Sequence, residues 1–170
     1  MCNLGSLSLP AYVVNGEFDY EALMAATRVL ARNLDRVIDI TYYPIEEARR
    51  SNLRHRPVGI GVSGLHDVFF LLKLPYDSQE AADLNRRIFE SIYFAAISTS
   101  CELAREHGQY STFDGSPASR GQLQYDLWGV TPVTAYAWGR LKEDIVAYGL
   151  RNSLSVAPMP TASTANIFGK

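Results

Sequence analysis

The sequence has few cysteines, no long apolar run and almost no net charge. Its two cysteines, Cys2 and Cys101, are too few for the disulfide framework of a small secreted protein, so we expect a reducing, cytoplasmic setting. The sequence lacks an apolar run long enough to span a bilayer, and its start lacks a basic region followed by an apolar one. The formal net charge of −2 gives no general attraction to nucleic acid or to a membrane surface. We therefore expect neither nucleic acid nor membrane as a partner.

The composition is that of an ordinary globular chain. Hydrophobic residues make up 47% and charged residues 20% of the 170 positions, which is enough to build one core. The sequence shows no internal repeat and no low-complexity segment. A cysteine lies near its start, and a helix is expected to begin just before its last residue. We therefore expect an internal piece of a longer protein.

Three segments have the apolar spacing of helices, namely Phe18–Ile40, Asp77–Gly108 and Val133–Tyr148. In the first, Asp35 is expected among the charged residues on the side opposite the apolar stripe. In the second, Asp77 and Glu80 resemble a capping box, and Cys101 is expected to be a buried structural thiol. Thr131-Pro132 is expected to begin the third helix. These helices alternate with short extended stretches, which predicts an α/β arrangement with helices outside strands too few to close a barrel.

A glycine-rich stretch, Gly59–Gly64, spells the G-x-G-x-x-G pattern of dinucleotide-binding folds. That site needs a strand before the glycines, but the residues before them, 51–57, are polar and end in proline. We therefore disfavour a nicotinamide site and expect a strand inside the glycines, at Val58–Val62. Glycines within a strand indicate that another backbone packs closely against it.

Basic residues cluster in the polar connection Ile45–Arg56. The cluster could be a patch for phosphate or nucleic acid, or it could be a solvated loop or short helix. The second interpretation is favoured, because no aromatic side chains alternate with the charges as single-strand binding requires. The residues concerned are Arg49, Arg50, Arg54, His55 and Arg56.

The last stretch predicts a strand, a tight turn and the start of a helix. Ser153–Ala157 alternates, with Leu154 and Val156 expected on one half-buried face, and prolines then end the strand. The small residues Thr161–Ala165 follow and begin the helix. The first N–H groups of a helix lack internal partners and carry partial positive charge, so a phosphate is a natural ligand there. The alternative from spacing alone is an ordinary capped helix.

Six segments, taken in order, resemble the large (alpha) subunit of class I ribonucleotide reductases. The resemblance covers essentially the whole chain, and the last loop and the glycine-rich stretch are specific to that family. The segments are CNLGSLSL at 2–9, YYP at 42–44, RPVGIGVSGLHD at 56–67, YDLWGVTP at 125–132, YGLRNSL at 148–154 and PMPTASTA at 158–165.

The resemblance implies a fold and a reaction. Residues 1–170 would form a helix-rich α/β part of the family's ten-stranded barrel, incomplete at both ends. The whole enzyme would reduce ribonucleoside diphosphates to deoxyribonucleotides by thiyl-radical chemistry, for DNA precursor synthesis. Cys2 would be one thiol of a redox-active disulfide, its partner lying outside this chain. The substrate diphosphate would bind at Thr161, Ala162, Ser163, Thr164 and Ala165.

The resemblance also implies cofactors and partners. We expect no metal and no cofactor bound by this chain, a radical supplied by a metal-containing small (beta) subunit, and ATP and deoxynucleotide effectors bound allosterically by regions outside it. The radical cysteine, in an N-x-C-x-E motif, would lie upstream. Further expected partners are thioredoxin or glutaredoxin and a second large subunit. The isolated chain is expected to be inactive. Two alternatives remain from the residues alone: a stand-alone phosphate- or nucleotide-binding module, and a purely structural helical domain.

Overall fold

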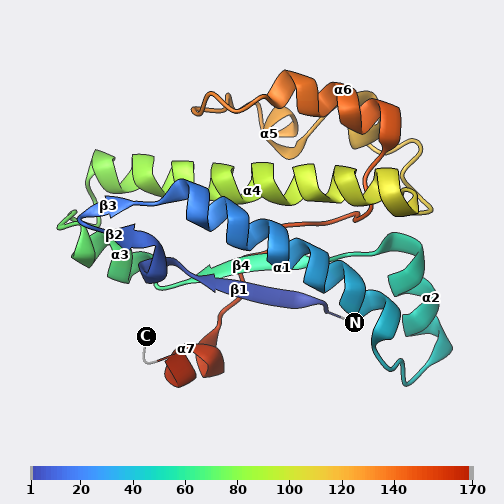
Figure 1. The fold of residues 1–170 in the computed structure, drawn as a ribbon, viewed down its shortest axis with the longest axis horizontal. Helices are drawn as coiled ribbons and strands as arrows, with labels where there is room; N and C mark the ends of the chain where they lie inside the picture. Colours follow the sequence, from blue (N-terminus) through green and yellow to red (C-terminus); the bar gives the residue numbers. More distant parts are fainter. Residues whose placement is uncertain (1, 169–170) are drawn as a thin grey trace.

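A small parallel sheet is covered on one side by the two longest helices (Figure 1). The computed structural model describes residues 2–168. Strand β1 (Leu4–Ser8) pairs in parallel with β4 (Gly59–Ser63), so that Leu4 lies opposite Gly59. Helices α1 (Tyr20–Ile40) and α4 (Gln79–His107) pack together on one side of these strands, and α7 (Ala162–Phe168) lies on the other side. The predicted helix-rich α/β class is confirmed, and the described strands do not close a barrel.

Residues 154–157 run along the edge of β4 that β1 leaves free. The Ile60 N–H donates to the Ser155 carbonyl at 2.9 Å, and the Ala157 N–H donates to the Ile60 carbonyl at 3.0 Å. The predicted strand is reduced to one parallel bridge, between Ile60 and Val156. Its predicted half-buried face is confirmed at Val156, which packs against the core, but is wrong at Leu154, which is 65% exposed while Ser155 is buried.

An irregular pairing explains that error. Leu154 and Ser155 are consecutive, yet their carbonyls accept from Val58 and Ile60, which are two positions apart on the neighbouring strand. One step along the last segment therefore corresponds to two steps along Val58–Ile60, at the start of β4. Such a mismatch breaks the two-residue alternation on which the prediction depended.

The two long helices lie close to their predicted positions. Helix α1 begins after Asp19, whose side chain accepts from the Ala22 N–H at 2.9 Å. Helix α4 begins after Ser78, whose hydroxyl accepts from the Ala81 N–H at 3.1 Å, so the predicted capping box at Asp77 is wrong by one residue. Gly108, with φ +83°, ends α4 as predicted.

Shorter elements connect these units. The 3₁₀ helix η1 (Leu9–Tyr12) leads into a hairpin of β2 (Val13–Val14) and β3 (Glu17–Phe18). The predicted polar connection forms α2 (Glu46–His55), and α3 (Leu65–Leu71) follows β4. An aromatic loop, residues 109–129, follows α4 and contains η2 (Ala118–Arg120) and α5 (Gln124–Leu127).

Helix α6 (Trp138–Tyr148) begins later than predicted, and Thr131-Pro132 does not start it. The carboxylate of Glu90, on α4, accepts hydrogen bonds from the N–H groups of Val133 and Thr134 at 2.9 and 3.1 Å. It also accepts from the Thr134 hydroxyl and from the Trp138 indole N–H. These bonds hold residues 133–134 against α4 in a non-helical conformation that local spacing could not reveal.

Helix α4 contributes to two buried cores. The first lies between α4, α1 and the sheet and includes Leu23, Ile60 and Ile92, all fully buried. The second lies between α4, the aromatic loop and α6 and includes Trp138 and Ile145. The two cores fix the sheet on one side of α4 and the segment 109–150 on the other.

Candidate functional site

The candidate site lies on the face of the sheet that α1 and α4 do not cover. Side chains alternate along β1, and a Cβ added at Gly5 would come within 2.8 Å of Leu30 on α1. Gly5 therefore faces the helices, and Leu4 and Ser6 face the opposite side. Continuing this alternation places Cys2 on the uncovered face.

Gly61 of β4 lets a second backbone cross the same uncovered face. A Cβ at Gly61 would lie 2.8 Å from the Ala157 carbonyl oxygen and 2.9 Å from Cε of Met159. No residue larger than glycine fits there unless the crossing segment moves. The predicted close packing of another backbone against this strand is thereby confirmed.

The glycines do not form a dinucleotide-binding turn. Gly59 and Gly61 lie inside β4, as predicted, whereas that motif requires the turn after a strand. Only Gly64 lies in the turn before α3, where it has φ +74°.

The crossing segment leads directly into α7, where the predicted helix start is confirmed. Thr161 has a left-handed backbone, with φ +53°, which turns the chain into the helix. Its carbonyl accepts from the Ala165 N–H at 2.7 Å and from the Thr164 hydroxyl at 3.0 Å. Ala162, Ser163 and Thr164 are exposed. The first turn of α7 thus presents backbone N–H groups and small side chains to solvent.

Cys2 is exposed and lies next to a firmly held residue. The Asn3 carbonyl accepts from the Gly59 N–H at 2.9 Å, and the Asn3 side chain donates to the Pro57 carbonyl at 3.0 Å. Asn3 is buried. The structure therefore fixes the backbone beside Cys2 on β4 while leaving the thiol open to a reactant.

Cys101, unlike the exposed Cys2, is buried, and its predicted burial on α4 is confirmed. Burial raises the pKa of its thiol to about 11, and the nearby Asp144 carboxylate adds to this effect. Since the thiolate is the reactive form, Cys101 is poorly suited to redox chemistry.

The prediction that Arg56 belongs to a solvated basic cluster is wrong, because its side chain is buried and the residue is only 4% exposed. Its guanidinium donates to Asp35 Oδ1 at 2.9 Å and to both Asp39 carboxylate oxygens at 2.8 and 2.9 Å. The hydrogen bond from Arg56 holds the pKa of Asp39 below its usual range. Burial alone would lower the pKa of Arg56, but the two carboxylates outweigh it and raise that pKa. Asp35, predicted to lie on the charged side of α1, is buried as well.

The sequence does carry one signal for this buried group. Asp35 and Asp39 are four residues apart, so they share one side of α1, and Asp35 lies directly beside the apolar Leu34. A carboxylate at the edge of an apolar stripe indicates a buried partner of opposite charge. The identity of that partner, at the end of α2, is a matter of tertiary packing.

A second functional candidate, also missed from the sequence, is Asn152. It is 2% exposed and begins the segment that leads to α7. Its side-chain amide donates to Asp35 Oδ1 at 2.9 Å and to the Arg56 carbonyl at 3.1 Å. Its side-chain oxygen accepts from the Ser100 hydroxyl at 3.0 Å. Asn152 thus ties this segment to α1, to α4 and to the residue after α2.

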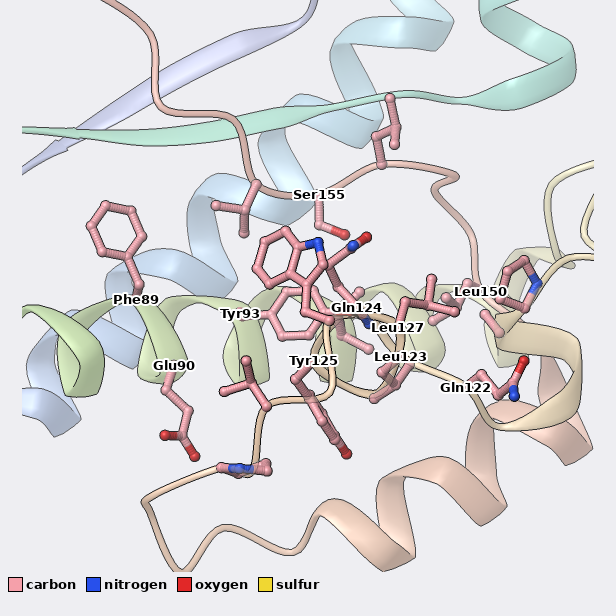
Figure 2. Close-up of a pocket in the computed structure, with 18 of the residues that line it drawn as sticks. Phe89, Glu90, Tyr93, Gln122, Leu123, Gln124, Tyr125, Leu127, Leu150 and Ser155 are labelled. Atoms are coloured by element: carbon pink, nitrogen blue, oxygen red, sulfur yellow. Dashed lines mark hydrogen bonds between the residues drawn. The ribbon is translucent and has the colours of Figure 1, made fainter.

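A cavity of about 690 Å³ lies between α4, the aromatic loop and the last segment (Figure 2). Tyr93 and Glu90 of α4 and Leu123 and Tyr125 of the loop line it. Burial alone would raise the pKa of Glu90, but its hydrogen bonds from residues 133, 134 and 138 outweigh burial and lower it. These donors belong to residues 133 and 134 and to Trp138, the first residue of α6, so Glu90 acts as a structural anchor for the entry into that helix.

The residues that the structure describes contain no cluster of three or more His, Cys, Asp or Glu side chains that could hold a metal ion. No helix within residues 2–168 is both long enough and apolar enough to cross a membrane.

Taken together, a small parallel sheet with helices on one side, and a thiol and an exposed helix start on the other, define a helix-rich α/β unit with a candidate site on its uncovered face. A family model described as "Ribonucleotide reductase, barrel domain" matches residues 1–170. The chain belongs to this family, in its large-subunit branch.

Three large subunits illustrate the similarity. The chain is 56% identical over 170 residues to the ribonucleoside-diphosphate reductase large subunit of Caenorhabditis elegans, covering 99% of this chain and 22% of that protein. It is 53% identical over 169 residues to the large chain of Schizosaccharomyces pombe, covering 99% and 21%. It is 57% identical over 169 residues to the large subunit of Vaccinia virus, covering 99% and 22%. The chain therefore spans about a fifth of the length of these relatives.

Proposed function

We propose that residues 1–170 are part of the catalytic barrel of a class I ribonucleoside-diphosphate reductase large subunit. The complete enzyme reduces ribonucleoside diphosphates to 2′-deoxyribonucleoside diphosphates by thiyl-radical chemistry, for DNA precursor synthesis. Identity of more than half over the whole chain supports the family's reaction. The observation that carries the proposal is that Cys2 and the segment entering α7 share the uncovered face of one small sheet.

The first turn of α7 binds the diphosphate of the substrate. Within Thr161–Ala165, the backbone N–H groups before Ala165 donate to phosphate oxygens, whereas the Ala165 N–H already donates to the Thr161 carbonyl. The helix dipole favours the negative charge. The Ser163 hydroxyl is free to add a further donor, while Thr164 already donates to a carbonyl within the turn. The exposure of these residues supports this role, because a ligand reaches the N–H groups without displacing a side chain.

Cys2 supplies reducing equivalents. Its thiol and a second cysteine thiol, outside this chain, together lose two electrons and two protons and form a disulfide. The substrate gains them as its 2′-hydroxyl leaves as water and a C–H bond takes its place. Thioredoxin or glutaredoxin then reduces the disulfide. The exposure of Cys2 beside a fixed backbone supports this role, since the thiol must meet a substrate and then a partner.

The remaining parts of the reaction lie in other chains or regions. A metal-containing small subunit generates the radical, and an upstream cysteine of the large subunit carries it to the substrate. ATP and deoxynucleotides bind to regions outside residues 1–170 and regulate the enzyme. The large subunit forms a homodimer in the cytoplasm, and residues 1–170 alone have no reductase activity.

The test compares the two cysteines in the large subunit that contains this segment, assayed with its small subunit. Cys2→Ser should abolish multiple-turnover reduction with thioredoxin while leaving the affinity for a nucleoside diphosphate unchanged. Cys101→Ala, at a buried thiol, is the matched control and should retain turnover. Full turnover by the Cys2→Ser enzyme would contradict the role proposed for Cys2 and limit this segment to binding a phosphate or nucleotide.

A further inference from the structure

Every polar group of the Asn152 side chain takes part in a hydrogen bond. Both amide N–H groups donate, to Asp35 Oδ1 at 2.9 Å and to the Arg56 carbonyl at 3.1 Å. The amide oxygen accepts from the Ser100 hydroxyl at 3.0 Å, and the same hydroxyl accepts from the Asn152 main-chain N–H at 2.9 Å. The three partner residues come from α1, α4 and the turn after α2.

These partners are buried and are themselves fixed. Asp35, Arg56 and Ser100 are each at most 5% exposed, so water cannot replace a lost bond. Asp35 is held by the Arg56 guanidinium, whose own position is set by Asp39. A network of this kind permits one arrangement of Asn152 and penalises any other, because each displaced group would be left without a partner.

The main chain around Asn152 is anchored at three consecutive residues. The Arg151 N–H donates to the Ser100 carbonyl at 3.0 Å, and the Ser153 N–H donates to the His55 carbonyl at 3.1 Å. After this anchor the segment forms only the irregular pairing with β4 and then crosses Gly61 into α7. The position of the turn at 161–165 therefore depends on where residues 151–153 are held, together with the hydrogen bonds between residues 154–157 and β4.

We infer that Asn152 is a positioning residue that sets the register in which Thr161–Ala165 meet the substrate diphosphate. This inference rests on the proposed function of that turn. Asn152 itself does not touch the substrate. It acts through the segment 153–160, by fixing that segment's starting point to α1 and α4.

An isosteric substitution separates this role from simple packing. Asn152→Asp keeps the shape of the side chain but replaces the two amide donors with an acceptor. That oxygen would face Asp35 Oδ1 and the Arg56 carbonyl, both of which are acceptors. The beginning of the segment must then move, and the turn at 161–165 moves with it.

The test measures KM and kcat for a ribonucleoside diphosphate in the large subunit that contains this segment, with its small subunit. Asn152→Asp should raise KM by about tenfold or more, because misplacing a substrate-holding group by about 1 Å costs up to two orders of magnitude. Ser100→Ala, which removes one partner of Asn152, should raise KM by about two- to tenfold, as for one hydrogen bond. In both variants kcat should change less than KM.

Ser91→Ala is the matched control. Ser91 is also a buried serine of α4, and its hydroxyl bonds to Tyr136 Oη at 2.8 Å, away from the last segment. Its loss should lower the unfolding temperature about as much as Ser100→Ala while leaving KM unchanged. If Asn152→Asp does not fold, the comparison of Ser100→Ala with Ser91→Ala decides. Equal KM values for those two variants, or an unchanged KM in a folded Asn152→Asp enzyme, would overturn the inference.

A variant within the turn distinguishes failure of this inference from failure of the proposed function. Ser163→Asp places a negative charge beside the bound diphosphate and should raise KM strongly. If it leaves KM unchanged, the proposed phosphate site is wrong. If it raises KM while the variants at Asn152 and Ser100 do not, the site stands and only the positioning role is wrong.

Discussion

Replacing Gly61 with alanine perturbs the crossing of the last segment over β4 at a single point. The added Cβ would lie 2.8 Å from the Ala157 carbonyl oxygen and 3.3 Å from the Met159 main-chain nitrogen. Ordinary contact begins at 3.4 Å, so the segment must move by about 0.6 Å. Because two of the three neighbouring atoms belong to the backbone, no side-chain rotation relieves the overlap. Overpacking of this kind costs about 1–3 kcal/mol of unfolding free energy.

Two measurements test Gly61→Ala. Urea unfolding should show a loss within that range, and KM for a nucleoside diphosphate should rise, since the same segment carries the turn at 161–165. Gly139→Ala is the control, because a Cβ at this exposed position of α6 meets nothing within 4 Å. It should stabilise the helix by about 0.5–1 kcal/mol and leave KM alone. Wild-type stability and KM in Gly61→Ala would refute the argument that close backbone packing holds this segment.

Three further predictions follow from the charges and thiols. Burial alone would raise the pKa of Glu90, but its hydrogen-bond donors lower it below the ordinary 4.5. Ionised Glu90 therefore stabilises the fold above pH 4.5, and this stability is lost as the pH falls through the lower pKa of the folded state. In Glu90→Gln, the unfolding temperature should depend less on pH below 4.5, as thermal unfolding at several pH values would show. Arg56→Met removes the guanidinium that hydrogen-bonds to the buried Asp35 carboxylate and leaves only the Arg151 guanidinium, 3.7 Å away, as its ion partner. This change should cost up to about 3–5 kcal/mol in urea unfolding, so a loss below about 1 kcal/mol would count against the buried ion pair. At pH 8, iodoacetamide should label Cys2 rapidly and Cys101, with a pKa of about 11, only after denaturation, as mass spectrometry of the peptides would show.

The sequence predicted well those features that depend on local spacing. The helix over 20–40, the end of α4 at Gly108 and the strand inside the glycines follow from apolar periodicity and from glycine chemistry. The start of α7 follows from the small residues after Pro160. In each case, neighbours in the chain determine the structure.

The errors arise where a distant group overrides local preference. Residues 133–137 have helical spacing, but the Glu90 carboxylate binds their main-chain N–H groups and delays α6. Leu154 alternates correctly for a buried strand, but its irregular pairing with β4 turns it outward. Arg56 and Asn152 look like surface residues in a polar stretch, and only packing against Asp35 buries them.

The candidate site shows the same division. The exposed helix start at 161–165 could be predicted from its residues, whereas the role proposed for Cys2 comes from the family resemblance and stays a prediction. Their common face could not, because it depends on three parallel segments pairing in one order across β4. That order joins residues separated by about the full length of the chain.

The most direct test of the central claim is a crystal structure of the large subunit that contains this segment, with a ribonucleoside diphosphate bound. We predict diphosphate oxygens within about 3 Å of the backbone nitrogens of Ser163 and Thr164, and the ribose on the side of the sheet that carries Cys2. A diphosphate bound elsewhere, with residues 161–165 covered by other side chains, would contradict the account.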